Sequence, residues 1–141
     1  NNIKILDNFI QKDYSNKISN YKNSFNYDLE ISSSAVNNDF MSEINKLGPF
    51  GNENFLPIFL IKNLKIIKTN IIKNKHISLI LKPIVGSSIK SICFNCMNTP
   101  MAEYLLSYKK PVNVIAELNE NIWNNKKTVQ LNIKDLLLNV N

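Results

Sequence analysis

The stretch TVQLNI, residues 128–133, alternates polar and apolar side chains without a break. Such alternation is typical of a β-strand with one face on a core, because successive side chains point to opposite faces of the sheet. Val129, Leu131 and Ile133 share the apolar face, and Gln130 lies on the polar one. We therefore predict a half-buried strand over residues 128–136.

Four further strands are predicted upstream of this one. They cover residues 112–118, 89–94, 76–81 and 58–72, and turn residues or prolines separate them. Thr99-Pro100, followed by Met101 and Leu105, predicts a short helix before the fourth strand, because proline favours a first helical position. Five strands with a helix before the fourth match the element order of an OB barrel.

A different pattern precedes the strands. An apolar stripe predicts a helix over about residues 6–21, and residues 27–31 alternate like a short strand. A second helix is expected from about Asn37, whose side chain can cap it, to Gly48-Pro49. The predicted fold class is α+β: a short helix-strand-helix leader followed by a five-stranded OB-type β-barrel with one short helix.

Positive charge is concentrated in the strand-rich part. Residues 1–57 carry 5 Lys against 7 Asp and Glu, whereas residues 58–141 carry 12 Lys against 4. One interpretation is a polyanion partner for the second part. The other is a solvated lysine surface from biased composition, since the chain has no Arg. The lysines of the first strand and its turn form at best a diffuse electrostatic rail: Lys62, Lys65, Lys68 and Lys73.

Several classes of protein are disfavoured. The chain has no apolar run near the roughly 20 residues that a membrane helix needs, so we expect no membrane partner and a cytoplasmic location. It begins with Asn1, which indicates a piece of a longer protein. Cys93 and Cys96 form a lone C-x-x-C; structural zinc needs four ligands and only His76 is left to join, so we interpret them as buried apolar residues.

Three stretches in order resemble the RecJ family. LGPFG at residues 47–51, with Asn54, Pro57 and Phe59 after it, is similar to the family's PFG-x-G-N-P-E-P-x-F signature. NIWNNKKTVQL at residues 121–131 resembles its N-E-W-N-G-R-x-S-V-Q-L ending, and KHI at 75–77 resembles its KHL strand start. Asn125 replaces the usual turn glycine, but Asn tolerates left-handed backbone, so a hairpin turn at Asn124-Asn125 is still expected.

The resemblance implies a domain division and an activity for the parent protein. Residues 1–57 would be the tail of the RecJ core (DHHA1-type) domain with a linker, and residues 58–141 an OB-type nucleic-acid-binding domain. The parent would be a 5′→3′ single-stranded-DNA exonuclease of recombination and repair, using Mn²⁺ or Mg²⁺. The chain has one His and no Asp-His-His or Gly-Gly-His string, so we expect no catalytic residue, no metal ligand and no cofactor in it, and no hydrolysis by it alone.

The expected partner is single-stranded DNA, bound by a monomer. The alternative is an OB-type protein-interaction module that docks a partner such as single-strand-binding protein, since lysines suit acidic peptides equally well. The candidate nucleic-acid-binding residues are Lys75, His76, Trp123, Asn124, Lys126, Lys127 and Gln130.

Each candidate has a structural alternative. Trp123 either stacks on bases or caps the end of the barrel. His76 either contacts a phosphate or base or makes a strand-end hydrogen bond, and Gln130 meets either a base edge or water. Phe94 is expected in the core, and Phe50-Gly51 with Asn54 is expected to fix a turn.

Overall fold

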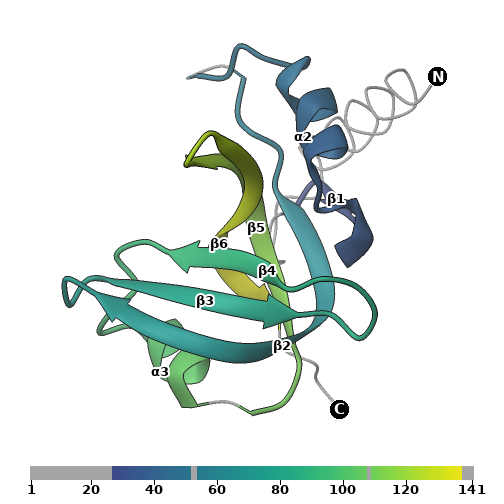
Figure 1. Ribbon diagram of the computed structural model, residues 1–141. Helices are drawn as coiled ribbons and strands as arrows, with labels where there is room; N and C mark the ends of the chain where they lie inside the picture. Colours follow the sequence, from purple (N-terminus) through teal and green to yellow (C-terminus); the bar gives the residue numbers. More distant parts are fainter. Residues whose placement is uncertain (1–26, 52–53, 108, 138–141) are drawn as a thin grey trace, which may run out of the picture.

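A computed structural model describes residues 27–51, 54–107 and 109–137. The helix predicted over residues 6–21 lies outside the described residues. Five strands form the body of the fold (Figure 1): β2 (Phe59–Ile72), β3 (His76–Lys82), β4 (Ile89–Cys93), β5 (Val112–Trp123) and β6 (Lys126–Leu137). Helix α3 (Pro100–Ser107) stands between β4 and β5.

The strands close into a barrel. β2 pairs with β3, β3 with β4, β4 with β6 and β6 with β5, and an additional β2–β5 pairing completes the circuit. All these pairs are antiparallel except β4–β6, which is parallel. The predicted five-stranded OB barrel, with its helix before the fourth strand, is confirmed.

The barrel interior is filled by alternating side chains from every strand. Phe59 and Leu64 of β2, Leu79 of β3, Leu118 of β5 and Leu131 of β6 are all at most 1% exposed. Ala102 and Leu105 add one face of α3 to the same cluster. Replacing a leucine at such a site by alanine typically costs about 2–5 kcal/mol, so this core holds the outward-facing side chains in fixed register.

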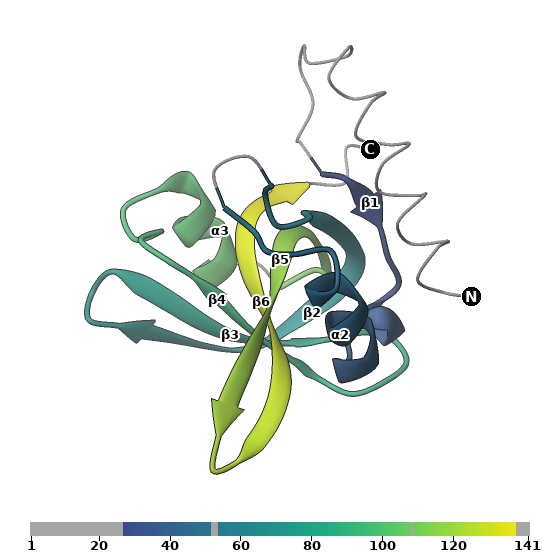
Figure 2. The same cartoon turned by 90° about the horizontal axis from the view of Figure 1, so that it is seen from above.

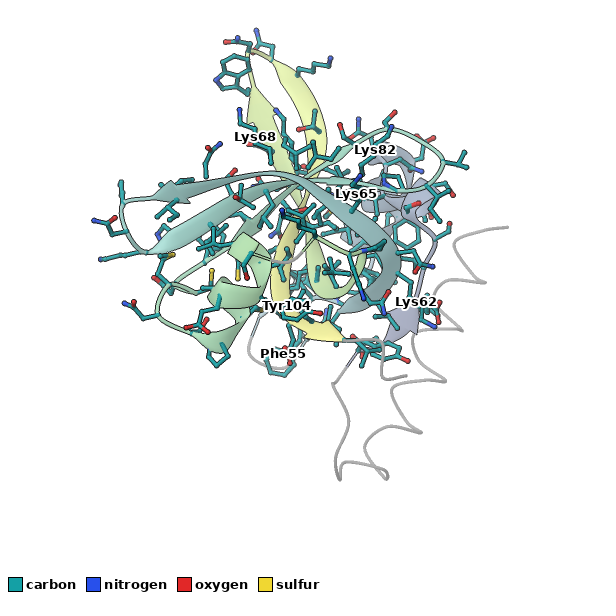
Figure 3. The ribbon with its side chains drawn as sticks, turned by 90° about the horizontal axis from the view of Figure 1, so that it is seen from below. Phe55, Lys62, Lys65, Lys68, Lys82 and Tyr104 are labelled. Carbon is teal, nitrogen blue, oxygen red and sulfur yellow. The ribbon has the colours of Figure 1, made fainter. Side chains whose placement is uncertain are left out.

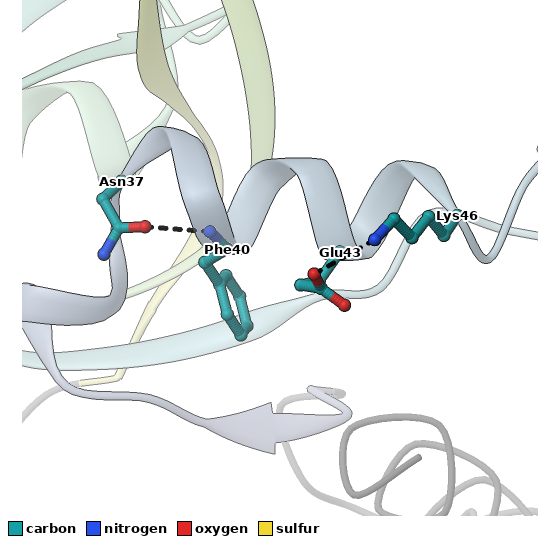
Figure 4. A network of polar contacts seen from close by, with 4 residues as sticks. All are labelled: Asn37, Phe40, Glu43 and Lys46. Atoms are coloured by element: carbon teal, nitrogen blue, oxygen red, sulfur yellow. Dashed lines mark hydrogen bonds and ion pairs between the residues drawn. The ribbon is translucent and has the colours of Figure 1, made fainter. Parts of the chain in front are cut away.

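The described part of the leader, from residue 27 on, packs against the barrel. β1 (Leu29–Glu30) pairs in parallel with the start of β2, and a 3₁₀ turn, η1 (Ser33–Ala35), leads to helix α2 (Asn38–Asn45). The predicted cap is present: the backbone N–H of Phe40 donates to Oδ1 of Asn37 at 2.8 Å (Figure 4). Met41 and Ile44 of α2 are buried in the core that the barrel strands form.

Helix α2 ends three residues before the predicted Gly48-Pro49 boundary. Lys46 is already its C-cap, and its N–H bonds to the carbonyls of Glu43 and Ile44. The residues that follow form the predicted turn around Phe50-Gly51. The side-chain amide of Asn54 closes this turn by donating to the carbonyl oxygens of Leu47 at 3.1 Å and Pro49 at 2.8 Å.

Candidate nucleic-acid interface

Strand register places one set of polar and basic side chains in a row across the outside of the barrel. Side chains of paired residues share a face of a sheet, so each chain of pairings can be followed from strand to strand. Starting from β2, the row is Lys68, Ile80, Lys90, Gln130 and Asn119. Its inward-facing neighbours, among them Leu79 and Leu131, are buried, which fixes this row to the outside.

A second row lies beside the first. Asn70 of β2 pairs with Ser78 of β3, Ser78 with Ile92 of β4, and Ile92 with Asn132 of β6. On the other side of the first row, Lys65 pairs directly with Lys82. We call the side chains that β2, β3, β4 and β6 contribute to these rows the outer face: Lys65, Lys68, Asn70, Ser78, Ile80, Lys82, Lys90, Ile92, Gln130 and Asn132.

The outer face is positively charged: it carries four lysines, and the neighbouring Glu117, which pairs with Asn132, lies 3.8 Å from Nζ of Lys134. Residues 58–102 contain seven lysines and no Asp or Glu. Like charges directly opposite each other destabilise a sheet, and Lys65 lies opposite Lys82, whose Nζ donates to the carbonyl oxygen of Gly86. The ion pairs between described residues use other lysines, such as Lys62, whose Nζ lies 3.4 Å from Glu30. Figure 3 shows Lys65, Lys68 and Lys82 on one side of the barrel, with Lys62 farther along β2.

Beyond the barrel, β5 and β6 continue as a two-stranded ribbon. β4 pairs with β6 only at residues 130–132, so residues 120–129 pair only with each other within the described structure. We call this ribbon the arm, and Figure 2 shows it running away from the barrel. Asn124 and Asn125 form its two-residue turn with φ of 50° and 61°. Both values lie in the left-handed region that such hairpin turns require, and the predicted turn is confirmed.

The two sides of the arm carry different side chains. Trp123 pairs with Lys126, and their face continues through Asn121–Thr128 to Asn119–Gln130 on the outer face. Ile122 pairs with Lys127 on the opposite face of the ribbon. Trp123 is 72% exposed, so it does not cap the barrel end by packing. The structure thus brings Trp123, Lys126 and Gln130 to one surface and turns Lys127 away from it.

Lys75 and His76 lie at the β2–β3 turn. The backbone N–H of Asn95 donates to Nδ1 of His76 at 2.9 Å, and the His76 ring meets Phe94 edge-on at 5.3 Å between centroids. The carbonyl oxygen of Lys75 accepts from the N–H of Met97 at 3.3 Å. His76 therefore has the structural hydrogen bond that was its alternative interpretation, while the side chain of Lys75 is exposed.

Phe94 corrects one prediction. It was expected in the core, yet it is 52% exposed. The physical reason is alternation: Cys93 is buried, so the next side chain points outward, where it packs on His76. Sequence reasoning also missed Lys82, Lys90 and Ile92. Their signal was available, because Lys90 and Ile92 alternate with the apolar or small residues Ile89, Ser91 and Cys93.

The two cysteines are core residues, as predicted. Cys93 is 1% exposed and Cys96 3% exposed, and the Sγ of Cys96 lies 3.2 Å from the carbonyl oxygen of Cys93. Burial, reinforced by Cys96, raises the pKa of the Cys93 thiol far above its ordinary value, which disfavours the thiolate that metals and oxidants need. Within the described ranges, no three His, Cys, Asp or Glu side chains gather as a metal site.

A depression of about 720 Å³ is lined by residues other than those of the outer face. It occupies the gap along β2 between β1 and the end of β3, and its walls include Ser33, Lys62 and Asn63. Ile84 and Val85 of the β3–β4 loop form one side of it and are 83% and 82% exposed. Among the described residues, no helix is long and apolar enough to cross a membrane.

The closed five-stranded barrel, its strand order and the helix before its fourth strand define an OB-fold protein. Residues 27–135 match the family model of the RecJ OB domain. This chain therefore belongs to the RecJ OB domain family.

Two solved structures with TM-scores above 0.5 agree on the fold. RecJ from Thermus thermophilus, in complex with Mn²⁺, superposes with a TM-score of 0.52 at 20% identity, over 72% of this chain and 14% of that one. A putative aspartyl-tRNA synthetase from Leishmania major Friedlin gives a TM-score of 0.53 at 13% identity, over 89% of this chain and 25% of that one. The mitochondrial single-stranded DNA binding protein Rim1 from S. cerevisiae gives 0.46 at 18% identity, over 61% and 99%.

The chain thus corresponds to a small part of the RecJ structure that it matches. The comparison with curated protein sequences gave no match.

Proposed function

We propose that this chain is the single-stranded-DNA-binding portion of a RecJ-like 5′→3′ exonuclease that acts in recombination and repair in the cytoplasm. In the parent protein, Mn²⁺ or Mg²⁺ held outside residues 1–141 would cleave the strand. This chain would hold the strand and feed its 5′ end to that centre. Residues 1–57 would be the end of the core domain with its linker, and residues 58–141 the binding domain.

One observation carries the binding proposal: the outer face and the Trp123 side of the arm are one continuous surface. Lysines of that surface would neutralise phosphates, and Trp123 would stack on a base, which is worth about 1–3 kcal/mol. Gln130 and Asn132 would meet base edges or sugar oxygens between them. Lys75 and Asn124, exposed at the two turns, would contact the strand at the ends of its path.

Oligonucleotide binding tests this proposal. The 141-residue chain is titrated into fluorescein-labelled oligo(dT), and anisotropy is recorded at several salt concentrations. Contacts to about three to five phosphates predict a log–log salt slope of about −2 to −3.5. Emission of the single tryptophan is followed in parallel and is expected to be quenched on binding. Absence of binding at low salt, or binding that does not respond to salt, would contradict the proposal.

A second candidate function has its own observation. The depression beside Ile84 and Val85 combines two exposed apolar side chains with the Lys62–Glu30 ion pair, which suits a peptide with apolar residues. The partner would be a protein such as single-strand-binding protein. We would test it with Ile84→Ser/Val85→Ser against Lys126→Glu/Lys127→Glu. Loss of peptide binding in the first variant, with oligo(dT) binding unchanged in every variant, would favour this function over DNA binding.

A further inference from the structure

The arm packs on the barrel core through Val129 near its base, but its outer part has less support. Residues 120–129 pair only across the ribbon within the described structure, and an isolated two-stranded hairpin is marginally stable in water. Such a ribbon is free to twist and swing about its base unless something outside the sheet holds it. The direction of Trp123, at the far end, depends on that support.

Helix α2 supplies contacts to both strands of the arm. The side-chain amide of Asn38 donates from Nδ2 to the carbonyl oxygen of Lys127 on β6, at 3.1 Å. The amide of Asn45 donates from Nδ2 to Oε1 of Glu120 on β5, also at 3.1 Å. One amide therefore binds each strand of the ribbon.

The helix that carries these amides is itself anchored. Asn38 and Asn45 are seven residues apart, close to two helical turns, so they lie on one side of α2. Met41 and Ile44 of the same helix are 4% and 1% exposed and belong to the core. Phe40 packs edge-on against Phe59 of β2 at 5.5 Å between ring centroids. The anchor is the barrel core, and the amides extend its rigidity to the arm.

The contact to the Glu120 side chain falls on one face of the arm, and the contact to the backbone carbonyl of Lys127 lies at the β6 edge. Glu120 shares the ribbon face of Ile122 and Lys127, which is opposite the face of Trp123 and Lys126. A ligand on the Trp123 side would therefore leave the contacts to α2 intact. Helix α2 therefore holds the arm at the Glu120 face and the β6 edge, and the Trp123 face stays open to a ligand.

We infer that Asn38 and Asn45 are positioning residues, through which α2 fixes the direction of the arm and with it the place of Trp123. In the binding mode proposed above, this brace keeps the indole in line with the outer face. It also couples the leader mechanically to the binding surface, because a shift of α2 would be transmitted to both strands of the arm. The inference about the arm itself stands without DNA; only its effect on affinity rests on the proposed function.

The test uses an exchange of hydrogen-bond partners. Asn45→Asp places two carboxylates against each other and removes the donor. Adding Glu120→Gln restores a donor–acceptor pair with its direction reversed. Asn38→Ala removes the second contact, and alanine is the better helix former, so α2 itself is not weakened. Ser42→Ala, at an exposed site on the same helix, is the matched control.

The first readout is time-resolved fluorescence depolarisation of Trp123 without any ligand. We expect larger-amplitude indole motion in Asn38→Ala/Asn45→Asp and in Asn45→Asp, no change in Ser42→Ala, and recovery in Asn45→Asp/Glu120→Gln. Unchanged indole motion in the first two variants, or no recovery in the exchanged pair, would overturn the inference.

The second readout is affinity for oligo(dT). We expect about threefold to tenfold weaker binding for Asn38→Ala/Asn45→Asp, with an unchanged salt slope and full recovery in the exchanged pair. If the unaltered chain does not bind oligo(dT), the proposed function fails, whereas the depolarisation experiment still decides the brace. If indole motion responds but affinity does not, the link from the brace to binding is wrong.

Discussion

The outer face and the arm present similar side chains on supports of very different stiffness. The outer face is spread over four hydrogen-bonded strands whose inward side chains, such as Leu79 and Leu131, are almost fully buried. The arm has two strands, and Ile122 and Trp123 near its tip are 61% and 72% exposed. Charge is therefore held by sheet register, whereas the aromatic ring depends on two side-chain amides of α2.

This difference suggests a division of labour. Lysines act through long-range attraction, which tolerates small displacements, and the sheet provides more rigidity than they need. Stacking requires a ring to meet a base face within van der Waals distance, so the arm has to be placed well. If both regions bind one DNA strand, the outer face sets the salt dependence of the affinity. The arm sets the part of the binding free energy that persists at high salt.

Charge reversal on the outer face is expected to have the largest effect. Lys68→Glu/Lys90→Glu changes the local charge by four units in the row that contains Gln130. We expect affinity for oligo(dT) to fall by about 30-fold or more at low salt, and the salt slope to flatten by roughly 1.4, because two phosphate contacts are lost. Fluorescence anisotropy measures both quantities.

The control is Lys109→Glu/Lys110→Glu, at two exposed lysines before β5, which makes the same change in net charge away from the outer face. An equal loss in the control would mean that net charge, and not the face, attracts the strand.

Removing the indole is expected to have the next largest effect. Trp123→Ala deletes a stacking surface worth about 1–3 kcal/mol, so we expect about tenfold weaker binding. The salt slope should stay the same, since no phosphate contact is lost. Trp123→Phe is the matched variant and should retain most of the affinity. A tenfold loss of affinity that disappears at high salt would mean that Trp123 acts through charge. The arm and the outer face would then not differ in how they bind DNA.

Loss of the α2 cap is expected to lower the free energy of unfolding and to leave the phosphate contacts of the outer face unchanged. Asn37→Ala removes the acceptor for the Phe40 N–H, which typically costs about 1 kcal/mol of free energy of unfolding. Urea denaturation followed by circular dichroism measures this change. The salt slope of DNA binding should be unaltered. A change in that slope would show that the face and the leader are not independent.

The smallest expected change in affinity comes from two neighbouring lysines on the arm, which lie on opposite faces. Lys126 shares the face of Trp123, and Lys127 lies on the opposite face with Ile122. We expect Lys126→Gln to weaken oligo(dT) binding about threefold and Lys127→Gln to leave it within about 1.5-fold, as one phosphate contact is worth little in water. Equal effects in paired titrations would show that the face of the ribbon on which a lysine lies does not decide whether it reaches the DNA.

The sequence was sufficient to predict the barrel and much of its surroundings. Alternation in residues 128–133 identified β6, Thr99-Pro100 located α3, and Asn37 was correctly predicted as a cap. These features are local, so a single strand or turn carries them. The end of α2 was placed late, because the tight turn at Lys46 depends on backbone bonds that no residue type specifies.

The binding surface could be predicted only in part. The turn made it possible to recognise Trp123, Asn124 and Lys126 as candidates. That Lys127 lies on the opposite face follows from the alternation of side chains along the paired strands. The row from Lys68 to Gln130 joins four strands that are distant in sequence, so it becomes visible only once register is known. Phe94 was misplaced because it was counted into a strand with inward-facing neighbours, whereas β4 ends at Cys93 and Phe94 points outward.

An NMR footprint tests the shared surface most directly. Amide shifts of the ¹⁵N-labelled chain are recorded during titration with oligo(dT). The largest changes are expected on the outer face and on the Trp123 side of the arm, at residues such as Lys68, Lys90, Gln130 and Trp123 together. Changes confined to the depression around Ile84 and Val85, or none at all, would contradict a nucleic-acid interface that runs from barrel to arm.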